Sequence, residues 1–209
     1  MGIVDQLSSR VGDRTERSNR QVAARCLAEP ALLAEVAGYL GSPDAALVGD
    51  CAEVLTKVAE GRPDLVAPYA ASLAPLLGHR HTRARWEAMH ALALVAPLVP
   101  DTIANVLPRL AESIRHDLSR IVRDYAIAAL SAYGQTSEAA AQSTFLILKE
   151  ALVSWDGKHT HQVLAGLAGM ASFLPTEDLA AIAAAYAGHA RPVVRRAAQA
   201  LHRASQGAQ

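Results

Sequence analysis

The residues best suited to chemistry stand close together in the segment RHTRARWEAMH, from Arg80 to His90. Its arginines could bind an anion, its histidine and glutamate could exchange protons, and Trp86 could anchor a partner. Glu87 and His90 are three residues apart, the ordinary spacing of neighbours on one helix, and this is weak support for a catalytic pair. The sequence has no glycine-rich phosphate loop and no nucleophile elbow. We therefore expect this segment to bind rather than to catalyse.

Histidines occur in pairs at HRH (79–81) and HTH (159–161), which invites a metal-binding interpretation. Metal sites normally add carboxylate or cysteine ligands at defined spacings, and no such set accompanies these pairs. Cys26 and Cys51 have neither zinc-site spacing nor a disulfide framework, and we expect Cys51 to be a buried free thiol. The sequence predicts no metal and no cofactor. Imidazoles close to helix C-termini interact well with the helix dipole, which accounts for these residues.

The composition is that of a globular protein. Of the 209 residues 51% are hydrophobic, and 20 basic residues balance 20 acidic ones. A dedicated nucleic-acid binder usually has a clear basic excess, so we expect no nucleic-acid partner. The longest apolar runs fall short of the ~20 residues of a membrane helix, and the N-terminus has no apolar signal region. We expect a cytoplasmic protein that does not contact a membrane.

One helical pattern of apolar residues occurs five times. In the segment above, apolar residues stand at offsets 0, 4, 7, 8 and 11, on one face of an α-helix. The pattern starts at Leu47, Ala84, Val122, Val163 and Val193. A second set of helices, which begin at prolines or at capping serine and threonine residues, lies between these five. The chain is therefore expected to form successive pairs of helices, with no strands.

This organisation resembles the HEAT-repeat family. The resemblance rests on IVRDYAIAALSAYG (121–134), on RPVVRRAAQALHRA (191–204) and on prolines inside the first helices of the pairs. It covers residues 30–206 and implies an all-α, right-handed α-α superhelix, a solenoid of about five helical hairpins. We expect residues 1–28 to form N-terminal capping helices and residues 1–209 to form a single domain. The fourth repeat departs most from the family pattern, because its second helix contains two glycines.

In this family the second helices line the concave side, which commonly holds a partner. The resemblance thus implies a non-enzymatic scaffold that binds a protein partner on its concave face. Positions at offsets 2 and 6 face away from the apolar stripe, and basic residues stand where two second helices begin. From these positions we predict the partner-binding residues Trp86, His90, Arg83, Arg120 and Asp124.

The resemblance also implies structural roles for Arg85 and Arg123 at offset 1. An arginine at this position commonly pairs with an aspartate in the turn of a neighbouring repeat, and Asp117 and Asp156 stand in such turns. Arg195 is shifted by one position from this pattern, so the role does not extend to it.

Enzymes with similar helical stacks are the alternatives. HEAT-like deoxyhypusine hydroxylases bind iron through repeated His-Glu pairs, and the sequence has no His-Glu dipeptide. HEAT-like DNA-alkylation repair glycosylases use tryptophan, aspartate and arginine on a basic concave face, and Trp86, Asp124, Arg83 and Arg120 are of these types. A DNA-binding enzyme of this kind stays an alternative, although neutral net charge weakens phosphate binding. A lyase or chaperone role, like that of the HEAT-type phycobilin lyases, also stays open. The sequence does not determine the oligomeric state.

Overall fold

The computed structural model describes residues 2–207, and every regular element in this range is a helix. No helix in this range is both long enough and apolar enough to cross a bilayer. The chain divides into two compact units, Met1–Thr102 (unit 1) and Ile103–Gln209 (unit 2). The single-domain organisation of residues 1–209 stays a prediction.

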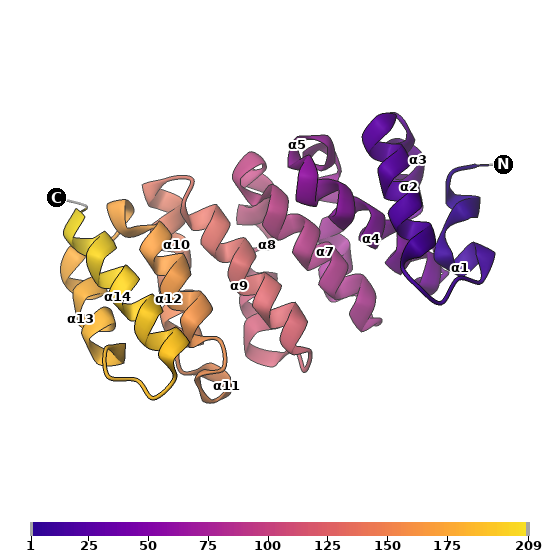
Figure 1. Ribbon diagram of the computed structural model, residues 1–209. Coiled ribbons are helices and arrows are strands. Elements are labelled where there is room, and N and C mark those ends of the chain that lie inside the picture. Colours follow the sequence, from indigo (N-terminus) through magenta and orange to yellow (C-terminus); the bar gives the residue numbers. More distant parts are fainter. Residues whose placement is uncertain (1, 208–209) are drawn as a thin grey trace. The chain divides into compact units, whose positions relative to one another are not determined.

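Unit 1 is built around three second helices that lie side by side, α2, α4 and α7 (Figure 1). The elements of unit 1 are η1 (Val4–Gln6), α1 (Ser8–Val11), α2 (Arg17–Ala28), α3 (Leu32–Gly38), α4 (Ala45–Gly61), α5 (Pro63–Val66), η2 (Ala67–Tyr69), α6 (Ala70–Leu73), η3 (Ala74–Gly78), α7 (Thr82–Val95) and η4 (Ala96–Leu98). The side chain of Asp44 accepts hydrogen bonds from the backbone N–H groups of Ala46 and Leu47, which caps α4.

The segment from Pro63 to Gly78, where a first helix with internal prolines was expected over 63–77, is divided into short α and 3-10 pieces. Pro68 and Pro75 stand at the starts of two 3-10 pieces, η2 and η3. A proline has no N–H to donate and its ring clashes with the preceding turn, so an α-helix cannot run through both positions undisturbed. The irregular backbone of this segment does not disturb the core beside it. The apolar residues of α4 and α7 are buried at all ten predicted positions.

Unit 2 has three second helices as well, and α12 packs against both α9 and α14. The elements that follow η4 are α8 (Pro100–His116), which begins in the last residues of unit 1, α9 (Arg120–Gly134), α10 (Glu138–Ala151), α11 (Ser154–Gly157), α12 (Thr160–Gly169), η5 (Ala171–Phe173), α13 (Thr176–Tyr186) and α14 (Pro192–Gly207). The apolar stripes that start at Val122 and Val163 are buried as predicted.

The predicted register of α14 is wrong by one residue. The expected stripe began at Val193, but the fully or almost fully buried residues are Val194, Ala198, Leu201 and Ser205. The sequence here contains the doublets Val193-Val194 and Ala197-Ala198, so two adjacent registers look equally apolar. Packing against α12 and α13 selects between them. With the stripe starting at Val194, Arg195 takes offset 1 after all.

Glycines on both α9 and α12 allow a close approach of these two helices. A Cβ atom on Gly166 would overlap the hydroxyl of Ser131, and one on Gly134 would overlap the sulfur of Met170. Gly169 faces the side chain of Gln135 in the same way. These residues are therefore glycine because the neighbouring helix occupies the space of a side chain.

Candidate functional site

Charged side chains from α2, α4 and α7 form one connected network in unit 1. Glu16, at the start of α2, accepts from Arg20 (2.9 Å) and from Lys57 (3.2 Å). Lys57 also pairs with Glu53 (3.1 Å), and Arg83 of α7 pairs with both Glu53 and Asp50. We call these six residues the unit 1 charge network: Glu16, Arg20, Asp50, Glu53, Lys57 and Arg83.

Two carboxylates of this network are buried, Asp50 at 0% exposure and Glu53 at 3%. The amide of Asn19 donates to Asp50 (2.9 Å) and to Glu53 (2.8 Å), and the backbone N–H of Ser9 donates to Asp50 (2.7 Å). Burial opposes ionisation of Asp50, but the hydrogen bonds from Ser9 and Asn19, with the charge of Arg83, outweigh it and lower its pKa. The buried charge is thus fully compensated, as a charge away from water must be.

Asn19, Asp50 and Glu53 were missed as site residues by the sequence analysis. Glu53 is at offset 6 from Leu47, so the pattern predicts that it faces away from the apolar stripe. That prediction is wrong as a guide to exposure on α4, because α7 packs against this face. The side chain of Arg83 covers Gly49, and Thr56 donates to the backbone carbonyl of Glu87. An available signal was the acid pair three residues apart inside the otherwise apolar segment ALVGDCAEVL.

Trp86 and His90 lie on α7 and are half-buried rather than fully exposed. The indole N–H of Trp86 donates to the carboxylate of Glu87 (2.7 Å). Burial raises the pKa of Glu87, and burial lowers the pKa of His90, whose charged neighbours include Glu60 and Lys57. Burial thus favours the neutral form of His90, and its charged neighbours belong to the C-terminal part of α4.

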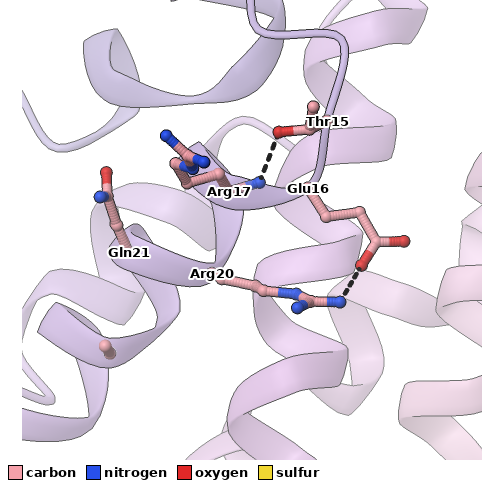
Figure 2. Close-up of a pocket in the computed structure, with 6 residues that line it drawn as sticks. Thr15, Glu16, Arg17, Arg20 and Gln21 are labelled. Carbon is pink, nitrogen blue, oxygen red and sulfur yellow. Dashed lines mark hydrogen bonds and ion pairs between the residues drawn. The ribbon is translucent and has the colours of Figure 1, made fainter.

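Two adjoining hollows lie along α2, with volumes of about 540 and 380 Å³, and both are lined by Arg20 and Ala24. We call them together the α2–α4 groove, lined by Thr15, Glu16, Arg17, Arg20, Gln21, Ala23, Ala24, Leu27, Lys57 and Glu60. In Figure 2 Arg20 reaches the carboxylate of Glu16, whereas Arg17 and Gln21 extend away from that pair. Within residues 2–207 the side chains of Arg17 and Gln21 have no hydrogen-bond or ion-pair partner.

In unit 2, both oxygens of Asp124 are engaged. Oδ2 lies 3.5 Å from Arg120 Nε, and Oδ1 lies 2.7 Å from Nδ1 of His159, which is 0% exposed. Arg123 Nε donates to His159 Nε2 (3.0 Å). A guanidinium can only donate, so Nε2 must accept, and the proton of the neutral imidazole is on Nδ1, from which it is donated to Asp124. This chain of bonds joins α9 to the start of α12.

The turn before His159 has an unusual backbone. Trp155 and Asp156 have φ of 54° and 56°, and Gly157 follows at 67°. Left-handed geometry costs about 1–2 kcal/mol for each residue other than glycine. Trp155 compensates, because its ring lies 3.8 Å from the guanidinium of Arg123 and its N–H donates to the carbonyl of Ile114 (2.9 Å). Arg123 is thus held by Trp155 and His159, and within residues 2–207 it makes no ion pair with Asp156.

Three arginines at offset 1 share a further role. Arg85, Arg123 and Arg195 each donate to a carbonyl six residues earlier, in the turn before their own helix: His79 O (2.9 Å), Asp117 O (2.6 Å) and His189 O (2.8 Å). At the same turn position, His79 Nδ1, Asp117 Oδ1 and His189 Nδ1 accept from a backbone N–H two residues later. Arg195 therefore belongs with the other two, which corrects the sequence analysis. The ring nitrogens of His79 and His189 are thus acceptors that close turns.

The predicted site residues are divided between the units. Arg83, Trp86 and His90 lie in unit 1, and Arg120 and Asp124 lie in unit 2 as an ion pair. The thiols of Cys26 and Cys51 are buried, and burial raises their pKa values to about 11 and about 12. They are poor nucleophiles at neutral pH, and Cys51 is buried as expected.

No protein-family model matches the sequence, and no curated protein matches it. Solved structures do. A designed armadillo repeat protein, YIII(Dq)4CqI, is 17% identical with a TM-score of 0.76, and the match covers 97% of this chain and 98% of that one. A designed armadillo repeat protein in complex with the peptide (KR)4 is 18% identical, with a TM-score of 0.73 and the same coverage.

A natural protein is similar too. The archaeal HEAT-like repeats protein from Thermococcus onnurineus NA1 is 13% identical with a TM-score of 0.59, over 91% of this chain and 93% of that one. At these identities the likeness concerns the fold and not the activity. The chain has the all-α helical-repeat fold of the HEAT and armadillo repeat proteins.

Proposed function

We propose that this protein is a non-enzymatic helical-repeat scaffold that binds a segment of a protein partner in the α2–α4 groove of unit 1. The main support for this proposal is the set of residues that line the groove. On one side Arg20 and Lys57 are held by Glu16, which is part of the unit 1 charge network. On the other side Arg17 and Gln21 make no side-chain bonds within residues 2–207, so they are available to a partner.

This division of roles favours binding. Side chains that are already fixed lose little conformational freedom when a partner arrives, so less of the interaction energy is spent on ordering them. The network extends from Glu16 at the surface to Asp50 in the interior, and so it ties the groove to the core of unit 1. Arg83 acts here as a positioning residue, because its guanidinium neutralises Asp50 and Glu53.

The lining also indicates the kind of segment that would fit. Arg17 suits a carboxylate, Gln21 suits a backbone amide, and Leu27, exposed at 40%, suits an apolar side chain. Arg17 and Leu27 are ten residues apart on α2, about 15 Å along the helix. An extended segment of about five residues spans that distance. Among the similar structures, one designed armadillo repeat protein is in complex with a peptide and another group was designed for modular peptide recognition.

Trp86 and His90 extend this surface onto α7 in the proposal. His90 is close enough to Glu60, which lines the α2–α4 groove, for that charge to affect its pKa. The indole N–H of the half-buried Trp86 already has its hydrogen bond, so the ring can contact a partner without leaving that N–H unsatisfied. Arg120 and Asp124 of unit 2 stay a prediction as partner-binding residues.

Site-specific photo-crosslinking in lysate of the source cell tests the groove. A photoreactive residue at Gln21 should capture a partner, and the same residue at Ala34, exposed on α3, should not. Adding Arg17→Glu should abolish capture at position 21 without changing the helical circular dichroism. Equal capture from both positions, or none from position 21, would contradict the proposal.

A further inference from the structure

Unit 2 has an apolar hollow between its last two helices, α13 and α14. Its volume is about 320 Å³, and we call it the α13–α14 groove, lined by Ala183, Ala184, Ala187, Ala198, Gln199, His202 and Arg203. Four of the lining residues are alanines, so the floor lies close to the two backbones. A row of small residues between two helices accepts a ridge of larger side chains from a third helix.

The charged residues of α14 are all basic, whereas α13 has Glu177 and Asp178 in its first turn. From Leu179 to Gly207 the sequence has four arginines and no aspartate, glutamate or lysine. Arg191 and Arg195 are used internally, because they donate to the carbonyls of Gly157 and His189. Arg196 and Arg203 are exposed, and within residues 2–207 they have no hydrogen-bond or ion-pair partner. The groove is thus bordered by two cations that lack an acid.

The spacing of these two cations matches a helix. Arg196 and Arg203 are seven residues apart, so they lie on the same side of α14, about 10.5 Å from each other along its axis. Gln199 lies between them on that side and lines the groove. A partner helix laid along α14 would present two of its own residues at the same separation.

We propose that the α13–α14 groove binds an acidic amphipathic helix of another protein. Apolar side chains of that helix would rest on the alanine floor, and two carboxylates seven residues apart would pair with Arg196 and Arg203. This site shares no residue with the α2–α4 groove, so it is a second interaction surface beyond the proposed function.

A second copy of this chain does not supply the required helix. Its acidic pairs at a spacing of seven are Glu53 with Glu60 and Asp117 with Asp124. Glu53 is buried in the unit 1 charge network. Asp124 is bonded to His159, and Asp117 stands before α9 rather than on it. Within these 209 residues no helix therefore offers the required pair of carboxylates.

A direct binding measurement with the full chain tests this. The probe is a fluorescent, helix-stapled peptide of about 15 residues, long enough for four turns, with leucines on one face and two glutamates seven residues apart. The control peptide has lysines in place of the glutamates. In fluorescence anisotropy the acidic peptide should bind, more weakly as salt is added, and the lysine peptide should not. Equal binding of both peptides, or binding of neither, would overturn the proposal.

Matched variants locate the site. Arg203→Glu should weaken binding of the acidic peptide about tenfold, since attraction becomes repulsion. Lys158→Glu makes the same change of net charge on an exposed residue outside the groove and should have no effect. Ala184→Gln should fill the groove and weaken binding, whereas Ala181→Gln, on an exposed position of α13 outside the lining, should not.

Charge reversal of both partners completes the test. The double variant R196E/R203E should bind the lysine peptide in place of the acidic one, which a merely unfolded variant could not do. Equal losses in each variant and its control would place the peptide elsewhere and overturn the proposal. The variants at Ala184, Arg196 and Arg203 leave the α2–α4 groove unchanged, so failure here leaves the proposed function standing.

Discussion

Arginines do two kinds of work in this chain. Arg85, Arg123 and Arg195 close the turns before their own helices by donating to backbone carbonyls. Arg83 instead neutralises two buried carboxylates from the surface of α7, where its side chain is 40% exposed. A guanidinium is always charged and has five donors in a fixed plane, so one residue type serves both purposes.

Removing Arg83 should destabilise the protein. Arg83→Ala leaves Asp50 and Glu53 buried without their main cation, and an unpaired buried charge is costly. Because Arg83 is partly exposed, we expect a loss of about 2 kcal/mol in the free energy of unfolding, below the usual range for a fully buried pair. Urea unfolding measures it. Arg62→Ala, which breaks an exposed pair with Asp64, is the matched control and should leave the unfolding midpoint unchanged. Similar midpoints for the two variants would contradict the role given to Arg83.

Glu87→Gln should stabilise the protein at neutral pH. Burial raises the pKa of Glu87 above its ordinary value of 4.5, so the folded state holds this proton more tightly than the unfolded state. The contribution of Glu87 is therefore fully present below pH 4.5 and is lost as the pH rises through the folded-state pKa. Glutamine stays neutral and still accepts from the indole of Trp86. Urea unfolding at pH 7 should give a higher free energy of unfolding for the variant than for the unchanged protein. This difference should shrink at about pH 4. A difference that does not change with pH would show that the charge of Glu87 is not what matters.

The apolar faces of four second helices were predictable from the repeated pattern. The stripes that start at Leu47, Ala84, Val122 and Val163 are buried at the predicted positions. The stripe on α14 was misplaced, since its valine and alanine doublets allow two registers and only the neighbouring helices distinguish them. The left-handed turn at Trp155 and Asp156 has no local cause, because neither residue is a glycine. Its bonds reach Ile114 and Arg123, far away in sequence.

The candidate site was predictable in part for the same reason. Periodicity places Arg83, Trp86 and His90 on one helix, and the structure has them on α7. Periodicity does not reveal that Asn19 donates hydrogen bonds to Asp50 and Glu53, because these two residues stand 31 and 34 positions after Asn19. Long-range pairing of polar groups depends on which helices become neighbours, and this follows from packing rather than from the period.

Gly166→Ala should separate α9 from α12. Its new Cβ atom would overlap the hydroxyl of Ser131, so one of the helices must shift, at a cost of about 1–3 kcal/mol as for other overpacked interiors. Thermal unfolding should show the loss. Adding Ser131→Ala should restore part of it, because the overlapping oxygen is gone. Gly38→Ala on α3, where a Cβ meets no atom within 4 Å, is the control and should be neutral or stabilising. A melting temperature for Gly166→Ala equal to that of the control would contradict this packing.

At the scale of the whole molecule, each unit has a core of its own. Leu55 and Leu92 lie in the core of unit 1, and Leu130 and Leu167 lie in that of unit 2, all at 0% exposure. In repeat proteins each helix pair is stabilised mainly by its neighbours, so damage to one place weakens distant repeats less than near ones. How far the destabilisation extends along the chain from a substituted residue can be measured.

Hydrogen exchange of two core variants measures it. Leu55→Ala should cost about 2–5 kcal/mol, the usual range for such a cavity. We expect faster amide exchange in α2, α4 and α7, with little change in α12 and α14, because stability is lost locally before it is lost globally. Leu167→Ala, the matched variant in unit 2, should give the reverse pattern. The prediction of a single domain across residues 1–209 requires another result, a uniform acceleration in both units from either variant. The two outcomes are exclusive, so one pair of variants decides whether the two compact units open independently or unfold as one.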